Sequence, residues 1–270
     1  MSVNSTINSP GRFANQFFRN LLCHFLSINN NIKFNYSFFN EFSDLGIDLY
    51  KDGSETYNET IDLNDDNFFH LVENKIKFNK NIKCEDLQQI YAQNEEFSIY
   101  IKKYIYQEEQ KNHIIQKNCF NNRYNNNNDL FLHVRMGDAV EYNPGFIYYD
   151  AILSNLQFNN GYISSDLIDH PMCTALKNKY KLNIYHDSEV KTIMFGSTCK
   201  NIVLSNGTFS WLIGLMGFYS KVYYPKIKKV WHGNIFVFPE WTEIDTSNSI
   251  PPLPYSIAKK LLETRSLKYT

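Results

Sequence analysis

The sequence contains no long apolar run, because no stretch of 18 apolar residues occurs anywhere in its 270 residues. Its first ten residues lack the basic and apolar regions of a signal peptide. Cysteine is also scarce: there are five cysteines, an odd number, with no CxxC pair, which argues against a disulfide framework or a zinc site. We therefore expect a cytoplasmic protein in a reducing compartment, with no membrane segment.

An excess of charge of either sign is missing as well. The 27 Lys and Arg residues almost balance the 28 Asp and Glu residues, and the formal net charge is −1. This balance excludes the broad basic field that binds nucleic acid or an anionic membrane surface. Any anionic ligand must therefore be held by a few placed groups.

Glycine and proline are also few, at 11 and 8 residues, whereas hydrophobic residues make up 43% and aromatic residues 16% of the chain. This composition is typical of a globular protein and not of a disordered or fibrous one. The 34 asparagines accompany many Ile, Lys, Phe and Tyr residues, whose codons are rich in A and T. We interpret this excess as a signature of genome composition, as in some protists and large DNA viruses.

The pattern along the chain predicts two lobes and a C-terminal segment. Apolar residues at helical spacing predict helices over 15–28 and within 86–110, while 29–66 shows no clear period. The polar run 121–128 predicts an exposed linker. The predicted division is a first lobe over 1–125, a second lobe over 126–250, and a helix within 251–270 that returns to the first lobe.

The second lobe has the more regular pattern. The apolar run 130–134 suits a strand that is buried on both faces, and it ends at Arg135. Further strand and helix signals then alternate along the chain; they lie at 148–158, 161–164, 172–180, 182–185, 189–199, 202–204, 209–219 and 222–224. This alternation predicts βαβ units, a parallel sheet and therefore a Rossmann-like lobe of the α/β class.

Two motifs follow strands of this predicted sheet. The first, His133-Val-Arg135-Met-Gly137-Asp138, places an arginine where a guanidinium can bind phosphate oxygens in a bidentate manner. The second, Ser205-Asn-Gly-Thr-Phe-Ser210, places hydroxyl and amide groups at a helix N-terminus, which is an anion site. An Arg–Asp ion pair and an ordinary helix cap remain open as alternative interpretations.

A third motif, Gly11-Arg-Phe-Ala-Asn-Gln16, opens the first predicted helix. It has neither the GxGxxG spacing of a dinucleotide fold nor the lysine of a P-loop. Along the chain this motif is followed by His133–Asp138, then by Tyr162-Ile-Ser-Ser-Asp166, and then by Ser205–Ser210. In this order the motifs resemble those of GDP-fucose-dependent fucosyltransferases. The resemblance is to the α-1,2-fucosyltransferases, and more distantly to the α-1,6- and protein O-fucosyltransferases.

The resemblance implies a GT-B fold of two facing Rossmann-like lobes, in which 1–125 is the acceptor-side lobe and 126–250 binds the nucleotide sugar. It also implies GDP-fucose as donor, a glycan or glycoprotein as acceptor, and an inverting reaction without a metal or other cofactor. The sequence has no DxD motif, which agrees with the last point. The implied catalytic residues are Arg135 on the diphosphate, Asp138, and Asn15 near the sugar. The implied donor-binding residues are Arg12, Gln16, His133, Gly137, Asp166, Ser205, Thr208, Phe209 and Ser210.

The sequence departs from this family where a second adjacent arginine is common, because Met136 stands there. Three functions therefore remain open: a fucosyltransferase, a GT-B enzyme that uses another nucleotide sugar, and a non-catalytic module that binds nucleotides or carbohydrates. Asp138 and Glu141 are the carboxylates nearest the central motif and are the candidates for a general base.

Overall fold

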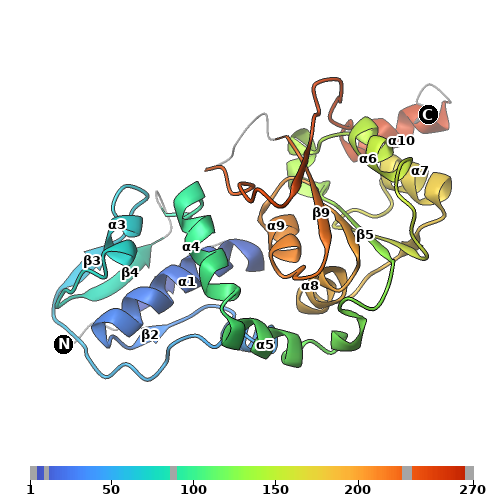
Figure 1. Ribbon diagram of the computed structural model, residues 1–270. Coiled ribbons are helices and arrows are strands. Elements are labelled where there is room, and N and C mark those ends of the chain that lie inside the picture. The colour runs from blue at the N-terminus through green and yellow to red at the C-terminus, as the bar shows by residue number, and fades with distance from the viewer. Residues whose placement is uncertain (1–4, 9–11, 86–89, 227–232, 265–270) are drawn as a thin grey trace. The chain divides into compact units, whose positions relative to one another are not determined.

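The computed structural model describes residues 5–8, 12–85, 90–226 and 233–264. The chain forms two compact units (Figure 1). Unit 1 comprises residues 1–118 and 231–237, and unit 2 comprises residues 119–230 and 238–270. No helix within these described ranges is long and apolar enough to span a membrane.

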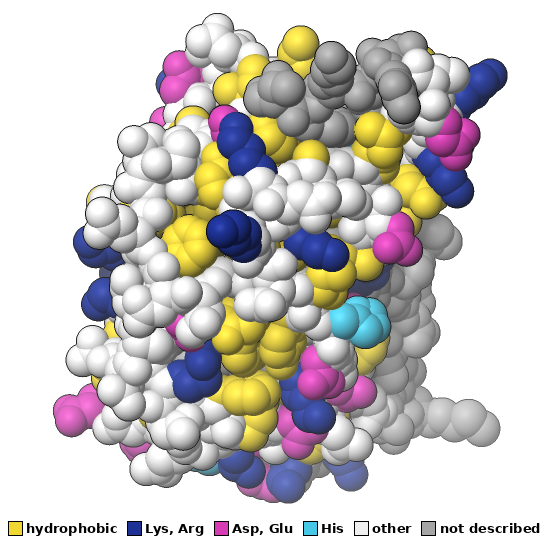
Figure 2. Space-filling model, turned by 90° about the vertical axis from the view of Figure 1, so that its right-hand side faces the viewer, with side chains coloured by type: hydrophobic (Ala, Val, Ile, Leu, Met, Phe, Trp, Pro, Cys, Tyr) yellow, Lys and Arg dark blue, Asp and Glu magenta, His cyan; other side chains and the backbone are white. Residues whose placement is uncertain are grey.

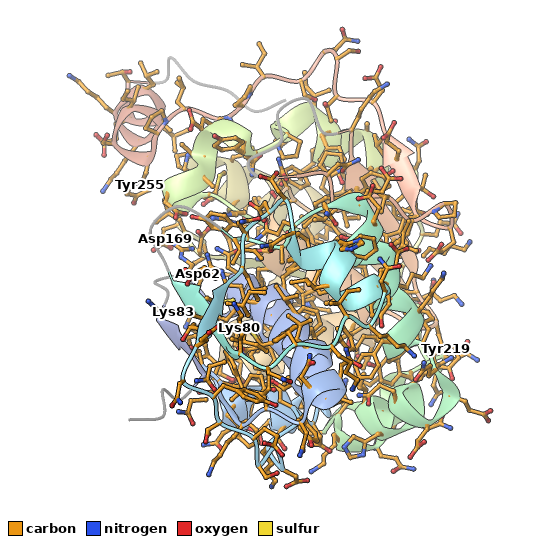
Figure 3. All side chains as sticks on the ribbon, turned by 90° about the vertical axis from the view of Figure 1, so that its left-hand side faces the viewer. Asp62, Lys80, Lys83, Asp169, Tyr219 and Tyr255 are labelled. Carbon is orange, nitrogen blue, oxygen red and sulfur yellow. The ribbon has the colours of Figure 1, made fainter. Side chains whose placement is uncertain are left out.

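Unit 1 is built on a parallel sheet with the strand order β2-β1-β4-β3. Asp62 and Lys83, labelled in Figure 3, are register partners on β3 and β4. The strands are β1 (Ser5–Asn8), β2 (Phe34–Asn35), β3 (Thr60–Asp62) and β4 (Asn81–Glu85). The helices are α1 (Phe13–Asn30), α2 (Phe39–Asp44), α3 (Phe68–Glu73), α4 (Glu95–Ile105) and α5 (Glu108–Lys117).

Helix α1 supplies much of the core of unit 1. Its apolar side chains at helical spacing, among them Phe17, Leu21 and Leu22, are almost completely buried. The same helix buries a charged residue, Arg19, whose Nε donates a hydrogen bond to the Ile90 carbonyl oxygen at 2.6 Å. This bond compensates part of the cost of burying the guanidinium, and it ties the segment before α4 to α1.

Two parts of unit 1 show detail that the sequence pattern does not give. The polar segment at the N-terminus forms β1, because its backbone pairs with β2 on one side and β4 on the other. The helical signal over 86–110 is resolved into α4 and α5, and residues 86–89 lie outside the described residues. Asn94 ends the preceding loop, where its side chain accepts a hydrogen bond from the Phe97 amide at 2.8 Å and caps α4.

A short segment from late in the chain completes unit 1. Residues 233–237 cluster with this unit. A Cβ atom at Gly233 would lie 1.9 Å from the Gln93 carbonyl oxygen, so the two backbones are in direct contact there. Unit 1 is therefore discontinuous in sequence.

Unit 2 confirms the predicted alternation of strands and helices. Its parallel sheet has the strand order β10-β9-β8-β5-β6-β7. The strands are β5 (Leu130–Val134), β6 (Gly161–Ser165), β7 (Asn183–Ile184), β8 (Asn201–Val203), β9 (Lys221–Pro225) and β10 (Thr242–Ile244). The helices are α6 (Phe146–Leu153), α7 (Pro171–Tyr180), α8 (Glu189–Ser197), α9 (Thr208–Leu215) and α10 (Tyr255–Glu263), with 3₁₀ turns η1 (Asn121–Arg123) and η2 (Gly137–Tyr142).

The strand order of unit 2 contains a topological switch point. The chain starts at β5, adds β6 and β7 on one side of it, and then returns to add β8, β9 and β10 on the other side. Every residue of β5 is buried, as expected for a central strand covered on both faces. Two parallel-sheet α/β units confirm the predicted fold class, and the crevice between the ends of β5 and β8 is where such sheets bind ligands.

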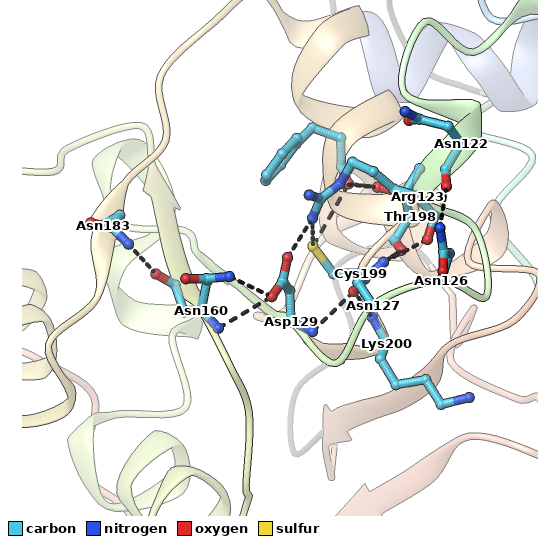
Figure 4. A network of polar contacts seen from close by, with 12 residues as sticks. Asn122, Arg123, Asn126, Asn127, Asp129, Asn160, Asn183, Thr198, Cys199 and Lys200 are labelled. Carbon is cyan, nitrogen blue, oxygen red and sulfur yellow. Dashed lines mark hydrogen bonds and ion pairs between the residues drawn. The ribbon is translucent and has the colours of Figure 1, made fainter.

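The segment 121–128 is largely exposed, as predicted, but it is not a linker between the lobes, because it belongs to unit 2 and is bonded to it (Figure 4). Arg123 forms an ion pair of 2.9 Å with Asp129 and donates from Nε to Thr198 Oγ1 at 3.1 Å. Asn127 donates to the Thr198 carbonyl oxygen at 2.9 Å. These polar contacts make the asparagine-rich segment part of unit 2. The division between the units therefore lies after Asn118 instead of after residue 125.

The C-terminal helix also differs from its prediction. Helix α10 belongs to unit 2, where it packs against α7, instead of returning to the first lobe. Nε2 of His170, at the start of α7, lies 2.9 Å from the Leu253 carbonyl oxygen, and this contact fixes the segment that leads into α10.

Figure 2 shows one face of the molecule, on which basic and acidic side chains are interspersed among polar and apolar ones.

Candidate functional site

The predicted site residues of unit 2 converge at the carboxyl edge of its sheet. His133 and Arg135 end β5 or follow it, Asp166 follows β6, and Thr208 begins α9 after β8. These three strands are adjacent in the order β8-β5-β6. The predicted residues His133, Arg135, Gly137, Asp138, Asp166, Ser205, Thr208, Phe209 and Ser210 therefore all lie around the switch point.

Arg135 lies against the loop that opens α9. A Cβ atom at Gly207 would lie 2.7 Å from Arg135 Nη1 and 3.2 Å from its Cδ. Gly207 has φ +118°, a backbone conformation that residues other than glycine rarely adopt. Glycine thus allows the guanidinium to lie directly beside the N-terminus of α9. Two groups that attract anions, a guanidinium and the amides of a helix N-terminus, are therefore neighbours.

Asp138 flanks this arrangement on the solvent side. Its Oδ1 lies 3.4 Å from Arg135 Nη2, and its side chain is 52% exposed against 16% for Arg135. The ion pair named as the alternative interpretation of this motif is therefore present. At that separation and exposure it is a weak pair, which leaves the guanidinium able to bind a stronger anion.

Asp166 holds the loop that follows β5. Its Oδ1 accepts a hydrogen bond from the Met136 amide at 2.7 Å. A Cβ atom at Gly137 would lie 2.6 Å from its Oδ2, so glycine is required for this close approach. The Met136 side chain is fully buried in the core of unit 2. An arginine in its place would start from a backbone position that points into the core, which explains the departure by packing.

His133 is buried between the sheet and α9. Its Nδ1 lies 2.6 Å from Ser210 Oγ, and its ring lies 5.1 Å from the Phe209 ring, measured between centroids. Burial lowers the pKa of His133 to about 4, an effect that the charge of Asp166 partly opposes and that of Arg135 reinforces. The imidazole is therefore neutral near pH 7.

Two of the predicted donor-binding side chains are not at the surface of the site. Ser205 is fully buried and Ser210 is 1% exposed and bonded to His133, so neither hydroxyl can reach a ligand directly. Both hydroxyls lie on the buried side of the loop that opens α9. Thr208 is 7% exposed, and Phe209 is half-buried. A ligand beside α9 would meet these two side chains and the backbone of the first turn.

Asn143 is a supporting residue that the sequence did not single out. Its buried amide donates to the Arg135 carbonyl oxygen at 2.6 Å and to the Tyr149 hydroxyl at 3.2 Å, and accepts from the Gly145 amide at 2.8 Å. It therefore fixes the backbone that carries Arg135. The only signal in the sequence is Asn-Pro-Gly, which reads as an ordinary turn.

A small cavity of about 120 Å³ opens at the same edge of the sheet. Glu141, Asn206 and Lys226 contribute to its walls, together with several prolines. It brings the other candidate base, Glu141, close to the loop after β8. Among the residues that the structure describes, no cluster of three or more His, Cys, Asp or Glu side chains could hold a metal ion.

The third motif lies in unit 1, at the start of α1. Arg12 is exposed at the N-cap position, and its carbonyl oxygen accepts from the amides of Asn15 and Gln16. Asn15 is half-buried, and its Oδ1 lies 3.3 Å from Gln93 Nε2. The Gln16 side chain is fully buried, so it contributes to the core of unit 1 instead of to a ligand site. Gly11 lies outside the described residues.

No family model and no curated protein matches this sequence. Among solved structures, the chain is similar to the E. coli heptosyltransferase WaaC with ADP-2-deoxy-2-fluoro heptose, with a TM-score of 0.49 and 10% identity over 96% of this chain and 98% of that one. The same enzyme with ADP gives 0.47 and 12% over 97% of both chains. POFUT1 in complex with GDP-fucose gives 0.33 and 11% over 79% of this chain and 70% of that one. At these identities the similarity concerns the fold alone.

Proposed function

We propose that the chain is an inverting GT-B glycosyltransferase that transfers fucose from GDP-fucose to a hydroxyl of a glycan or glycoprotein, without a metal. The observation that supports this proposal is the contact between Arg135 and Gly207 at the switch point of unit 2. It makes a compact anion site in a chain of almost zero net charge.

In the proposed reaction, the acceptor oxygen attacks the anomeric carbon while the bond between that carbon and the diphosphate oxygen breaks. Negative charge accumulates on the departing GDP. The Arg135 guanidinium and the first-turn amides of α9 are held in place before the reaction, so they stabilise this charge without reorganisation. Groups that are preorganised in this way contribute several kcal/mol to lowering a barrier of this kind.

The proton of the acceptor needs a base. Asp138 and Glu141 are the candidates in unit 2, and both are exposed carboxylates near the β5 loop. Asp138 is paired with Arg135, so its proposed role is to orient the guanidinium as well as to accept a proton. From unit 1 we propose that Arg12 and Asn15 contact the sugar or the acceptor.

A second candidate is a GT-B enzyme with another nucleotide sugar as donor. The groups described above address a diphosphate, which all such donors share. Position 136, where a second arginine is common in fucosyltransferases, holds a buried methionine, so this position does not discriminate between donors. The donor specificity is therefore a matter for experiment.

The test is isothermal titration of the whole chain with GDP, UDP and ADP, followed by assays of donor hydrolysis and of transfer to a panel of glycans. We expect GDP to bind at least tenfold more tightly than UDP or ADP, and Arg135→Ala to abolish both GDP binding and turnover. Lys221→Ala removes an exposed cation from the first residue of β9, at the opposite edge of the sheet, and is the matched control. A preference for UDP or ADP supports the second candidate. GDP binding without turnover in any assay supports a binding module, and full turnover of Arg135→Ala overturns the assignment.

A further inference from the structure

His133 and Ser210 form a contact whose direction can be worked out. The two atoms, His133 Nδ1 and Ser210 Oγ, are 2.6 Å apart. His133 comes from β5, and Ser210 comes from the first turns of α9. Both are buried, at 6% and 1% exposure. A hydrogen bond that is buried on both sides determines which imidazole nitrogen carries the hydrogen.

Ser210 must be the donor in this hydrogen bond. Within the described part of the chain, the Ser210 hydroxyl has one side-chain or backbone partner, His133 Nδ1. If Nδ1 carried the hydrogen, the hydroxyl hydrogen of Ser210 would be buried without an acceptor, which is costly. With Ser210 as the donor, Nδ1 accepts, and both groups are satisfied.

The other ring nitrogen, Nε2, is the one that can donate to a ligand. A neutral imidazole that accepts at Nδ1 carries its hydrogen on Nε2. Some polar side-chain atoms of the described residues are buried and have no hydrogen-bond partner, and His133 Nε2 is not among them. The 6% of His133 that is exposed therefore includes Nε2. Arg135 and Asp166 both lie close enough to influence the ring electrostatically, and both border the site.

We propose that Ser210 is a positioning residue, which fixes His133 in the tautomer with hydrogen on Nε2, and that this N–H donates a hydrogen bond to an oxygen of the bound nucleotide sugar. His133 then supplies a neutral donor beside the Arg135 cation and is not the general base. The identity of the ligand rests on the proposed function, whereas the tautomer of the free protein does not.

The tautomer is measured directly by long-range ¹⁵N–¹H correlation NMR of the full chain without ligand, with His133→Gln used to assign the signal. We expect the tautomer with hydrogen on Nε2 in the wild-type protein, and a mixture of both tautomers in Ser210→Ala. Ser197→Ala removes a different buried hydroxyl from unit 2 and serves as the control that leaves the His133 signal unchanged. Hydrogen on Nδ1 in the wild-type protein overturns the proposal, even if Ser210→Ala does not fold.

The role in binding is tested by titration with GDP and GDP-fucose. Loss of one fixed hydrogen bond predicts that Ser210→Ala weakens binding by about 3- to 10-fold. His133→Asn, whose amide reaches only the Nδ1 position, should weaken it about tenfold more than His133→Gln, whose amide reaches the Nε2 position. Equal losses in these two variants contradict donation from Nε2. Absence of GDP binding in the wild-type protein counts against the proposed function and leaves the NMR result as the test of the tautomer.

Discussion

Gly207 and Arg135 are packed so closely that the glycine hydrogen faces the guanidinium, with 2.7 Å between Nη1 and the position of a Cβ atom. Gly207→Ala should displace Arg135 and strain a backbone with φ +118°. We expect GDP affinity to fall by at least tenfold and the free energy of unfolding by about 1–2 kcal/mol. Titration and urea denaturation measure the two effects.

The control for this substitution is Gly46→Ala in unit 1, where φ is +79° and a Cβ atom would lie 2.8 Å from the Ile114 Cα. It should cost comparable stability and leave GDP affinity unchanged. If both alanine variants lower affinity equally, the Gly207 effect reflects general destabilisation and not the anion site.

Asp166 provides a second test, because it accepts a hydrogen bond from the Met136 amide at 2.7 Å. Asp166→Ala leaves that amide without its acceptor, and we expect a loss of about 1 kcal/mol in the free energy of unfolding together with weaker GDP binding. Asp166→Asn keeps an oxygen acceptor and should retain the stability. Chemical denaturation of both variants is the measurement; equal stability of Ala and Asn variants would show that the hydrogen bond does not hold the loop.

Asn143 should be the most sensitive polar residue behind the site. Asn143→Ala removes the partners of the Arg135 carbonyl oxygen and the Gly145 amide. We expect a loss of about 2–3 kcal/mol in the free energy of unfolding, since buried groups are left unsatisfied. The same substitution at the exposed Asn155 should cost less than about 0.5 kcal/mol. Denaturant midpoints compare the two, and a small effect at Asn143 would contradict its role.

The buried His133 predicts a loss of stability in acid. Burial lowers the pKa of this group from 6.5 to about 4 in the folded chain, so the unfolded chain binds the proton more readily. Its contribution is complete above pH 6.5 and is lost as the pH falls through this interval, by about 3 kcal/mol in total.

The measurement is the free energy of unfolding at several pH values between 7 and 4. His133→Gln should reduce the pH dependence, and His24 in unit 1, whose pKa burial also lowers to about 4, should account for part of what remains. His186→Gln replaces an exposed histidine and should leave the curve unchanged. An identical curve for His133→Gln and the wild-type protein would contradict the prediction.

Much of unit 2 could be predicted because its strands are short apolar runs. Leu130–Val134 is buried on both faces, and such a run has no other simple interpretation once helices flank it. Unit 1 gave weaker signals. Its strand Phe34–Asn35 has two residues, and Ser5–Asn8 is polar and held by backbone pairing on both sides. Backbone pairing of this kind leaves no periodic pattern to detect.

The site shows the same division. The positions of Arg135 and Thr208 after the ends of β5 and β8 could be predicted, because both strands are short apolar runs followed at once by a turn or a helix. Whether a hydroxyl faces a ligand or the core depends on packing, so the sequence motif does not reveal that Ser205 and Ser210 are buried. The run 121–128 predicts a linker although it belongs to unit 2, because a surface linker and an exposed segment with tertiary hydrogen bonds have the same composition.

The contact between Gly233 and Gln93 bears on how the chain acquires its structure during synthesis. The segment that completes unit 1 leaves the ribosome after residues 119–230 of unit 2 and before its elements β10 and α10. Unit 1 therefore stays incomplete during the synthesis of residues 119–230, and a fragment that stops at residue 118 lacks one segment of this unit. Producing the two units separately requires that 231–237 be supplied to the first.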